Sequence, residues 1–289
     1  MALAKNLYSE ATDVIAAGKQ ITFNIPAYDC ISQFFLNFIN DDAQATVANI
    51  KSSIAKLRLI LDGEVVLDCT PTELYDYYQS LGQEVSRDAI SNGVLPLYIA
   101  PIAFKQPSAE DALAIGCDSF ANGKPLTNIQ LQVVCGQTIT DITNVSAITE
   151  RFAMGTGNNI TRLYTKLISY AQNLSGTGDS TVDTLPRDIN EAYMSVIVSP
   201  EGGTITKGEA IVNGKNVIQK IDIATMNAAC ACRGFGVIAG SFNYLFGDGG
   251  DKASLPMVGV NDFRLKTTFS VAPTGGAYKL LAASIKSAS

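Results

Sequence analysis

The sequence predicts an all-β chain made of two tandem domains of the same type, with a few short helices. Thr, Ser, Asn, Val and Ile are plentiful, and 24 Gly and 10 Pro are spread along the 289 residues. This composition favours short strands joined by tight turns. A strand–turn–strand–helix unit at residues 57–82 has a counterpart that begins 151 residues later. A period of that length indicates two whole domains, because solenoid repeats are much shorter.

The first unit, at residues 57–82, is marked by its turn and by its helix start. Apolar residues alternate up to Asp62-Gly63, a pair that favours the type I′ turn of a two-residue hairpin. After the returning strand, Thr70 is a good N-cap, and Glu73 three residues later closes a capping box. We therefore expect a hairpin followed by a short helix.

The second unit repeats this order of elements. Asn213-Gly214 has the same turn chemistry as the first pair, and a short strand follows it. Asp222 then opens a helix, and another strand is expected after Gly240.

The N-terminal residues 1–18 predict an amphipathic helix that ends at Gly18. Its apolar face would consist of Leu3, Leu7, Ala11, Val14 and Ile15. Such a helix either packs against the body of the protein or lies against a neighbour or a membrane surface.

Further strands are expected wherever apolar residues alternate or run together between turn residues. They lie at 20–28, 30–39, 94–104, 128–135, 193–200, 240–246, 262–271 and 277–285, and residues 108–117 include a short helical turn.

Charge and histidine content exclude several classes of function. With 21 Lys and Arg against 27 Asp and Glu, the net charge is −6, and the basic residues are scattered. Direct binding of nucleic acid needs clustered Lys and Arg, so it is not expected. The chain contains no His, which removes the commonest general base and zinc ligand. We expect no enzyme activity and no catalytic residue.

The six cysteines are expected to be free thiols that act as small apolar side chains. Cys230-Ala-Cys232 is spaced too closely for a CxxC metal or redox pattern. They are Cys30, Cys69, Cys117, Cys135, Cys230 and Cys232.

Two acidic pairs are the candidates for a metal site, namely Asp248 with Asp251 and Asp41 with Asp42. Calcium prefers several oxygen ligands, but neither pair lies in an EF-hand pattern, so solvated turns are the better interpretation. No cofactor is expected, with calcium left open.

Two further motifs have a structural and a functional interpretation. The glycine-rich stretches 155–159 and 176–178 lack the residues that follow a phosphate-binding loop, so turns are expected. Tyr75, Tyr77 and Tyr78 could stack on a sugar or a base, but tyrosines also pack a helix onto a sheet.

Many short strands with one helix after a hairpin in each half suit a sandwich or a jelly roll. The sequence therefore predicts two tandem eight-stranded jelly rolls. The expected parts are the N-terminal helix at 1–18, a first roll at 19–148 and a second roll at 149–289.

The order of these elements resembles the major capsid proteins of tailless icosahedral phages with an internal membrane, of the corticovirus and finnlakevirus types. The resemblance lies in LRLILDGEVVLDC (57–69) and its helix, VLPLYIAPIAF (94–104), SAEDALAIGC (108–117) and NIQLQVVC (128–135). The segment VNDFRLKTTFS (260–270) is also similar.

The resemblance implies a double jelly roll that forms trimers with a pseudo-hexagonal outline. These trimers would tile an icosahedral shell around a lipid membrane, with the N-terminal helix at the foot near the lipid. The implied partners are further copies of the chain, penton and minor capsid proteins and the membrane, without nucleic acid. The chain would be made in the host cytoplasm and reside in the virion, and a calcium ion between rolls or subunits is compatible with the family.

Two alternatives remain open at this point. One is a carbohydrate-binding or glycan-active double β-sandwich, which would need exposed aromatic residues or a close carboxylate pair, although the chain has no Trp. The other is a minor structural protein of a phage, such as a spike.

Overall fold

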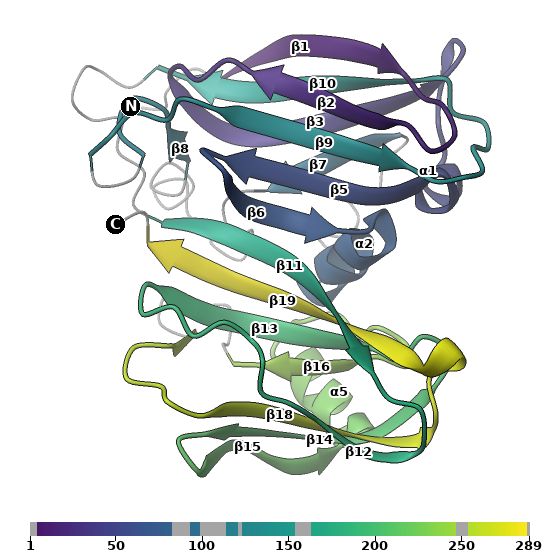
Figure 1. The fold of residues 1–289 in the computed structure, drawn as a ribbon, viewed down its shortest axis with the longest axis vertical. Coiled ribbons are helices and arrows are strands. Elements are labelled where there is room, and N and C mark those ends of the chain that lie inside the picture. The colour runs from purple at the N-terminus through teal and green to yellow at the C-terminus, as the bar shows by residue number, and fades with distance from the viewer. Residues whose placement is uncertain are drawn as a thin grey trace. The chain divides into compact units, whose positions relative to one another are not determined.

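The computed structural model describes residues 5–82, 93–98, 114–120, 123–153, 163–246 and 254–287, which are predominantly β-strand (Figure 1). The chain divides into two compact units. The first comprises Met1–Tyr78, Glu84–Leu167 and Lys286–Ser289, and the second comprises Gln79–Gln83 and Ile168–Ile285. The domain boundary expected at residues 148 and 149 falls within strand β10.

The first unit contains two sheets. One has the order β1 (Asn6–Val14), β10 (Asn144–Phe152), β3 (Cys30–Asn40), with β4 (Ala43–Gln44), β7 (Val94–Tyr98) and β8 (Ile115–Gly116) also paired to β3. The other has the order β2 (Gln20–Ile25), β9 (Ile129–Cys135), β5 (Ile54–Leu61), β6 (Glu64–Cys69). Helix α1 (Val47–Ser53) precedes β5, and helix α2 (Pro71–Ser80) follows β6.

The second unit also contains two sheets. One has the order β11 (Leu163–Asn173), β19 (Ala277–Ser287), β13 (Glu191–Ser199), β16 (Phe242–Leu245), with β17 (Leu255–Pro256) also on β13. The other has the order β12 (Gly178–Val182), β18 (Phe263–Val271), β14 (Thr204–Val212), β15 (Lys215–Asp222). Helix α5 (Ile223–Cys232) follows β15, and a 3₁₀ turn, η1 (Thr274–Gly276), precedes β19.

The two units have the same strand order. When the principal strands of each are lettered B to I along the chain, both units give the sheets B-I-D-G and C-H-E-F. This is the order of a jelly roll. Strand β1 thus corresponds to β11, and the hairpin β5–β6 with helix α2 corresponds to β14–β15 with helix α5 (Figure 1). The predicted double jelly roll is confirmed.

Both hairpin turns adopt the predicted geometry. Asp62 and Gly63 have φ angles of 47° and 88°, and Asn213 and Gly214 have φ angles of 48° and 75°. Positive φ at both central residues defines the type I′ turn, whose twist suits the flanking strands.

The helix starts also follow the sequence prediction. The backbone N–H of Thr70 donates to Glu73 Oε2 at 2.8 Å, and the N–H of Glu73 donates to Thr70 Oγ1 at 3.2 Å. These two bonds are the reciprocal pair of a capping box. At α5, the N–H of Thr225 donates to Asp222 Oδ1 at 2.8 Å.

The N-terminal helix expected over residues 1–18 is wrong, because Asn6–Val14 form strand β1, antiparallel to β10. A bulge between Ser9 and Ala11 interrupts the strand's alternation. Leu7 and Val14, which suggested a helical face, are 67% and 59% exposed. The helical spacing therefore came from side chains on the outside of a strand, and pairing with β10 decides the structure.

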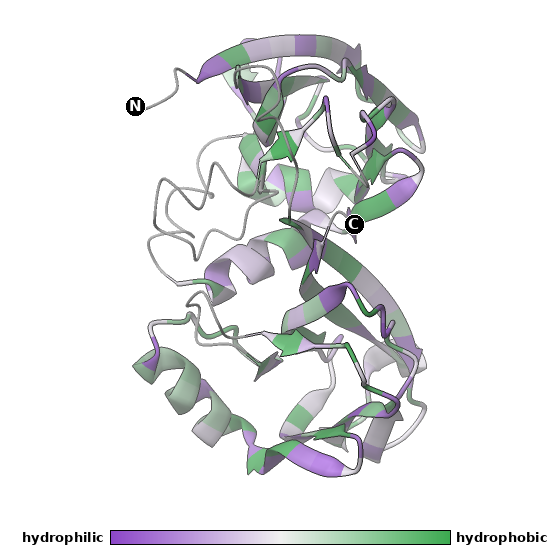
Figure 2. Cartoon of the chain, turned by 90° about the vertical axis from the view of Figure 1, so that its left-hand side faces the viewer, coloured by the Kyte–Doolittle hydropathy of each residue, from purple (hydrophilic) through white to green (hydrophobic). Residues whose placement is uncertain are grey.

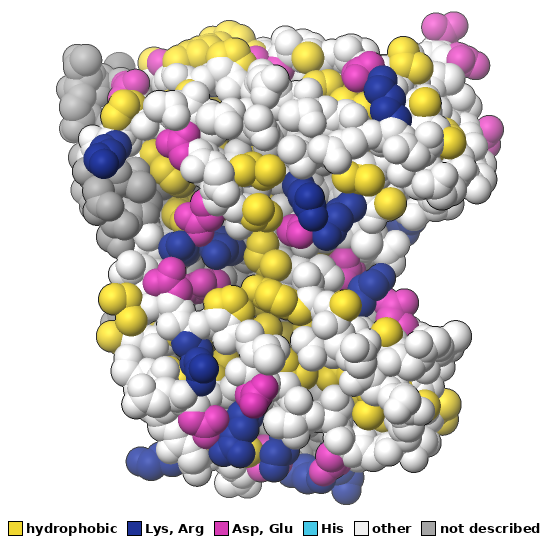
Figure 3. All heavy atoms as spheres, in the orientation of Figure 1, with side chains coloured by type: hydrophobic (Ala, Val, Ile, Leu, Met, Phe, Trp, Pro, Cys, Tyr) yellow, Lys and Arg dark blue, Asp and Glu magenta, His cyan; other side chains and the backbone are white. Residues whose placement is uncertain are grey.

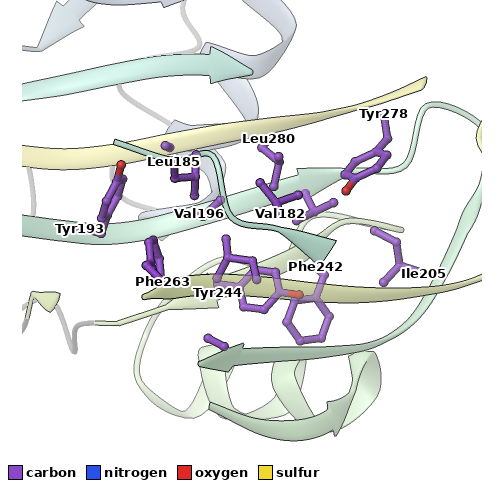
Figure 4. Packing of buried hydrophobic residues seen from close by; sticks show 14 of the residues in the cluster. Val182, Leu185, Tyr193, Val196, Ile205, Phe242, Tyr244, Phe263, Tyr278 and Leu280 are labelled. Carbon is purple, nitrogen blue, oxygen red and sulfur yellow. The ribbon is translucent and has the colours of Figure 1, made fainter. Parts of the chain in front are cut away.

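The core of each roll forms because one face of every inner strand is apolar. Along β9 and β18 buried and half-buried residues alternate, and Figure 2 shows how hydropathy changes along the strands. The core of the second unit is rich in aromatic side chains, as the close view shows (Figure 4). It includes Tyr193, Phe242, Tyr244, Phe263, Phe269 and Tyr278.

No helix among the described residues is both long and apolar enough to span a membrane.

The outer edge of β6 is covered by the first residues of β11, which belong to the first unit. Glu64 of β6 accepts a hydrogen bond from Tyr164 at 2.8 Å and one from Lys286 at 2.7 Å, and Lys166 lies 3.3 Å away. Burial of the carboxyl works towards a higher pKa, but the bonds from Lys286 and Tyr164 outweigh it, and the pKa of Glu64 is lowered.

We predict that Gly63→Val destabilises the chain by about 1–2 kcal/mol, because a side chain at positive φ is strained. Gly176→Val is the control. Both glycines have open space around them, but only Gly63 has a positive φ. Urea denaturation measures the two free energies of unfolding, and an equal midpoint for the two variants would contradict the tight-turn geometry.

We also predict a pH-dependent effect of Glu64→Gln. Because the folded pKa lies below the unfolded value of about 4.3, ionised Glu64 stabilises the fold above that pH. The contribution is lost as the pH falls through the folded pKa. The stability difference between wild type and Glu64→Gln should therefore be largest near neutral pH and disappear in acid.

Denaturant midpoints from neutral to acidic pH measure this difference. Asp41→Asn, which removes an exposed carboxylate from a turn, is the control for the loss of one carboxylate. A difference for Glu64→Gln that stays constant across the pH range would show that its bonds do not favour the ionised form.

Candidate functional site

Of the two acidic pairs proposed as metal ligands, only Asp41 with Asp42 lies among the described residues. Asp41 and Asp42 lie exposed in the turn between β3 and β4, where the N–H of Asp41 donates to Thr143 Oγ1 at 3.0 Å. Asp248 and Asp251 fall outside the described residues. No group of three or more His, Cys, Asp or Glu side chains within the described part of the chain could hold a metal ion. Calcium binding therefore stays a prediction.

The tyrosines of α2 are packed inside the first roll. Tyr75, Tyr77 and Tyr78 are all buried, and the Tyr78 hydroxyl donates to the carbonyl oxygen of Pro96 at 2.6 Å. Burial raises the pKa of Tyr75 to about 12. These rings are not available to stack on a sugar or base, so the packing interpretation is correct for them.

Of the two glycine-rich stretches, only residues 176–178 are described. Gly176 precedes strand β12, which begins at Gly178, as expected of a turn, whereas residues 155–159 lie outside the described residues.

None of the six cysteines forms a disulfide in the structure. Five are buried, and Cys232 on α5 is exposed. Burial raises the pKa of the Cys117 thiol to about 12, so this group stays protonated and unreactive at neutral pH.

Strand β1 is fixed to the first roll by a buried arginine. The guanidinium of Arg151, on β10, is fully buried and lies 2.7 Å from Glu10 Oε1 of β1. It also donates to the carbonyl oxygens of Tyr28 and Pro26, both at 2.8 Å, and to Thr149 Oγ1 at 2.8 Å. A buried charge without its partners would cost several kcal/mol, so this cluster fixes the register of β1.

Arg151, Glu10 and Glu64 were not predicted as important residues from the sequence. A weak signal exists for Arg151, because it continues the inward-facing series Val145, Ala147 of β10. A charge at such a position indicates a buried partner. The bulge that turns Glu10 inward has no comparable signal in the sequence.

Strands β1 and β15 are two of the edge strands in the described part of the chain. Strand β1 pairs only with β10, and β15 pairs only with β14. Exposed apolar residues accompany both, namely Leu7, Tyr8 and Val14 on β1 and Val217 on β15. Figure 3 shows yellow side chains along the upper rim, where Figure 1 places β1, and Lys and Arg gathered along the lower rim near β14 and β15. Such edges favour pairing with another chain.

The described residues therefore offer interaction surfaces and no recognisable catalytic group. The titratable groups with strongly raised pKa values are buried tyrosines and thiols inside the two rolls. Burial is the largest cause of each shift, and nearby charges, such as Arg151 beside Cys117 and Glu191 beside Tyr193, contribute less.

No protein family and no curated protein matches the sequence. Solved structures are nevertheless similar over nearly the whole chain. The major capsid protein P2 from bacteriophage PM2 is similar with a TM-score of 0.77 and 14% identity, covering 98% of this chain and 98% of that chain.

Two other viral proteins show the same likeness. The PBCV-1 virus capsid gives a TM-score of 0.70 with 10% identity, covering 97% of this chain and 93% of that chain. The structure of Sulfolobus Turreted Icosahedral Virus gives a TM-score of 0.68 with 13% identity, covering 98% of this chain and 90% of that chain. At these identities the likeness shows the fold: both rolls of this chain are arranged along the sequence as in the double jelly rolls of major capsid proteins.

Proposed function

We propose that this chain is a major capsid protein that assembles into trimers with a pseudo-hexagonal outline. Three chains with two rolls each present six similar corners, and such units tile the facets of an icosahedral shell. The observation that carries the proposal is the duplication of one strand order in two rolls along a single chain. The likeness to viral major capsid proteins over 98% of the chain supports it.

The proposed role is structural and needs no catalytic residue or cofactor. Assembly would proceed through symmetric, largely preformed contacts, with many weak interfaces summed over the shell. The partners would be further copies of this chain and the penton and minor capsid proteins. Calcium binding by Asp41, Asp42, Asp248 or Asp251 is not required for this role and stays a prediction.

The shell would enclose a lipid membrane and belong to a virion assembled from chains made in the host cytoplasm. The net charge of −6 supports a location away from the genome. Because residues 6–14 form strand β1, an amphipathic helix over those residues would not make the lipid contact. The membrane contact would involve other parts of the chain.

Size-exclusion chromatography with light scattering tests the proposal on the full chain. We predict a particle of three times the chain mass of 30.6 kDa. A chain that remains monomeric at micromolar concentrations would contradict it. A monomer that also binds glycans would favour the carbohydrate-binding alternative.

A further inference from the structure

The open edges of β1 and β15 are equivalent to two edges that meet within this chain. In the shared strand order, β15 corresponds to β6 and β1 corresponds to β11. Strand β11 is the neighbour of β6 in the sheet, and Tyr164 and Lys166 of β11 contact Glu64 of β6. An edge equivalent to that of β15 is therefore covered, within the chain, by a strand equivalent to β1.

The sequences of the two covering strands support their equivalence. Strand β1 contains Leu7-Tyr8-Ser9-Glu10, and β11 contains Leu163-Tyr164-Thr165-Lys166. Both stretches have Leu, Tyr, a hydroxyl residue and a charged residue in that order. In β1 the Leu and the Tyr of this stretch are exposed, with Leu7 at 67% and Tyr8 at 37%, whereas in β11 Leu163 is 39% exposed and Tyr164 is buried.

Burial on the covered and open edges differs in the way that a missing partner would produce. Val66 and Val217 both stand three residues after the turn glycine of their hairpin. Val66 is 2% exposed and lines a hollow together with Thr165 and Leu167 of β11, whereas Val217 is 47% exposed. A strand placed on β15 as β11 is placed on β6 would bury Val217.

The charged residues at the start of β6 and β15 differ, so a contact at β15 would not repeat the ion pair that β6 makes with β11. Glu64 begins β6 and is bound by Tyr164 and Lys166 of β11, but Lys215 stands at the same place in β15. Glu10, at the position of Lys166, is held by Arg151. The contact at β15 would therefore depend on backbone pairing and apolar side chains more than on an ion pair.

We propose that β15 of one copy is covered by β1 of a second copy, as β11 covers β6 within one chain. The inference rests on the proposed function, since the second copy is the neighbour in the trimer. The contact joins two different surfaces, so it is heterologous, and such contacts either close a ring or continue into a filament. Three copies joined in this way leave no β1 or β15 edge open.

Two single substitutions test the proposal in the full chain, namely Val217→Lys on β15 and Tyr8→Lys on β1, because Tyr164, the counterpart of Tyr8, is buried. Each places a charge where the contact would bury an apolar side chain, and a buried unpaired charge costs enough to weaken association about tenfold or more. Light scattering across a dilution series should show trimers shifting to smaller species for both variants. Val258→Lys is the control, because Val258 is 65% exposed and lies outside both strands.

The outcomes separate this inference from the proposed function. If wild type and Val258→Lys are trimers and both edge variants dissociate with unchanged melting temperatures, the edge contact is supported. If all four proteins are trimers of equal stability to dilution, the edge contact is wrong while the trimer stands. If wild type itself is a monomer, the proposed function fails, and the edge contact fails with it.

Discussion

In each roll, a side-chain oxygen of the hairpin turn accepts hydrogen bonds from the backbone at the start of the neighbouring strand, and the rest of the roll depends on this contact. Asp62 Oδ1 accepts hydrogen bonds from the N–H groups of Thr127 and Asn128, at 3.0 and 2.7 Å, just before β9. Asn213 Oδ1 accepts them from the N–H groups of Asn261 and Asp262, at 2.9 and 3.1 Å, just before β18. The same residue thus supplies the positive φ of the turn and fixes where the inner strand of the sheet begins. The register of each C-H-E-F sheet follows from this point.

Because the roll is duplicated, the chain has two sets of edge strands. Each roll buries one face of its strands in its own core, and the edges must then be covered, charged or paired. In the first unit β6 is covered by β11, and Glu64 holds that contact with Tyr164. The edges of β1 and β15 stay open within the described residues, and Arg151 keeps β1 rigidly in place by holding Glu10. A fixed, exposed edge loses little conformational entropy on binding, which favours association.

Local chemistry was predictable from the sequence, and long-range pairing was not. The two turns, the capping box of Thr70 and the cap at Asp222 are encoded within four residues each, and the structure has all of them. The placement of β1 depends on β10, which lies more than 100 residues away, and on a bulge that leaves no local signal. For the same reason Glu64 and Arg151 were missed, since their partners come from distant strands. The duplicated turn was the one long-range feature that the sequence revealed directly.

Hydrogen exchange of the wild-type oligomer tests most directly whether the open edge of the second roll is covered in the assembly. Amide groups of β15 that do not bond to β14 should exchange as slowly as those of β6, whose edge is paired with β11. The same amides should exchange fast after dilution to the monomer. If β15 exchanges at the rate of an open strand while light scattering shows a trimer, the trimer is held together elsewhere and the equivalence of the two edges is contradicted.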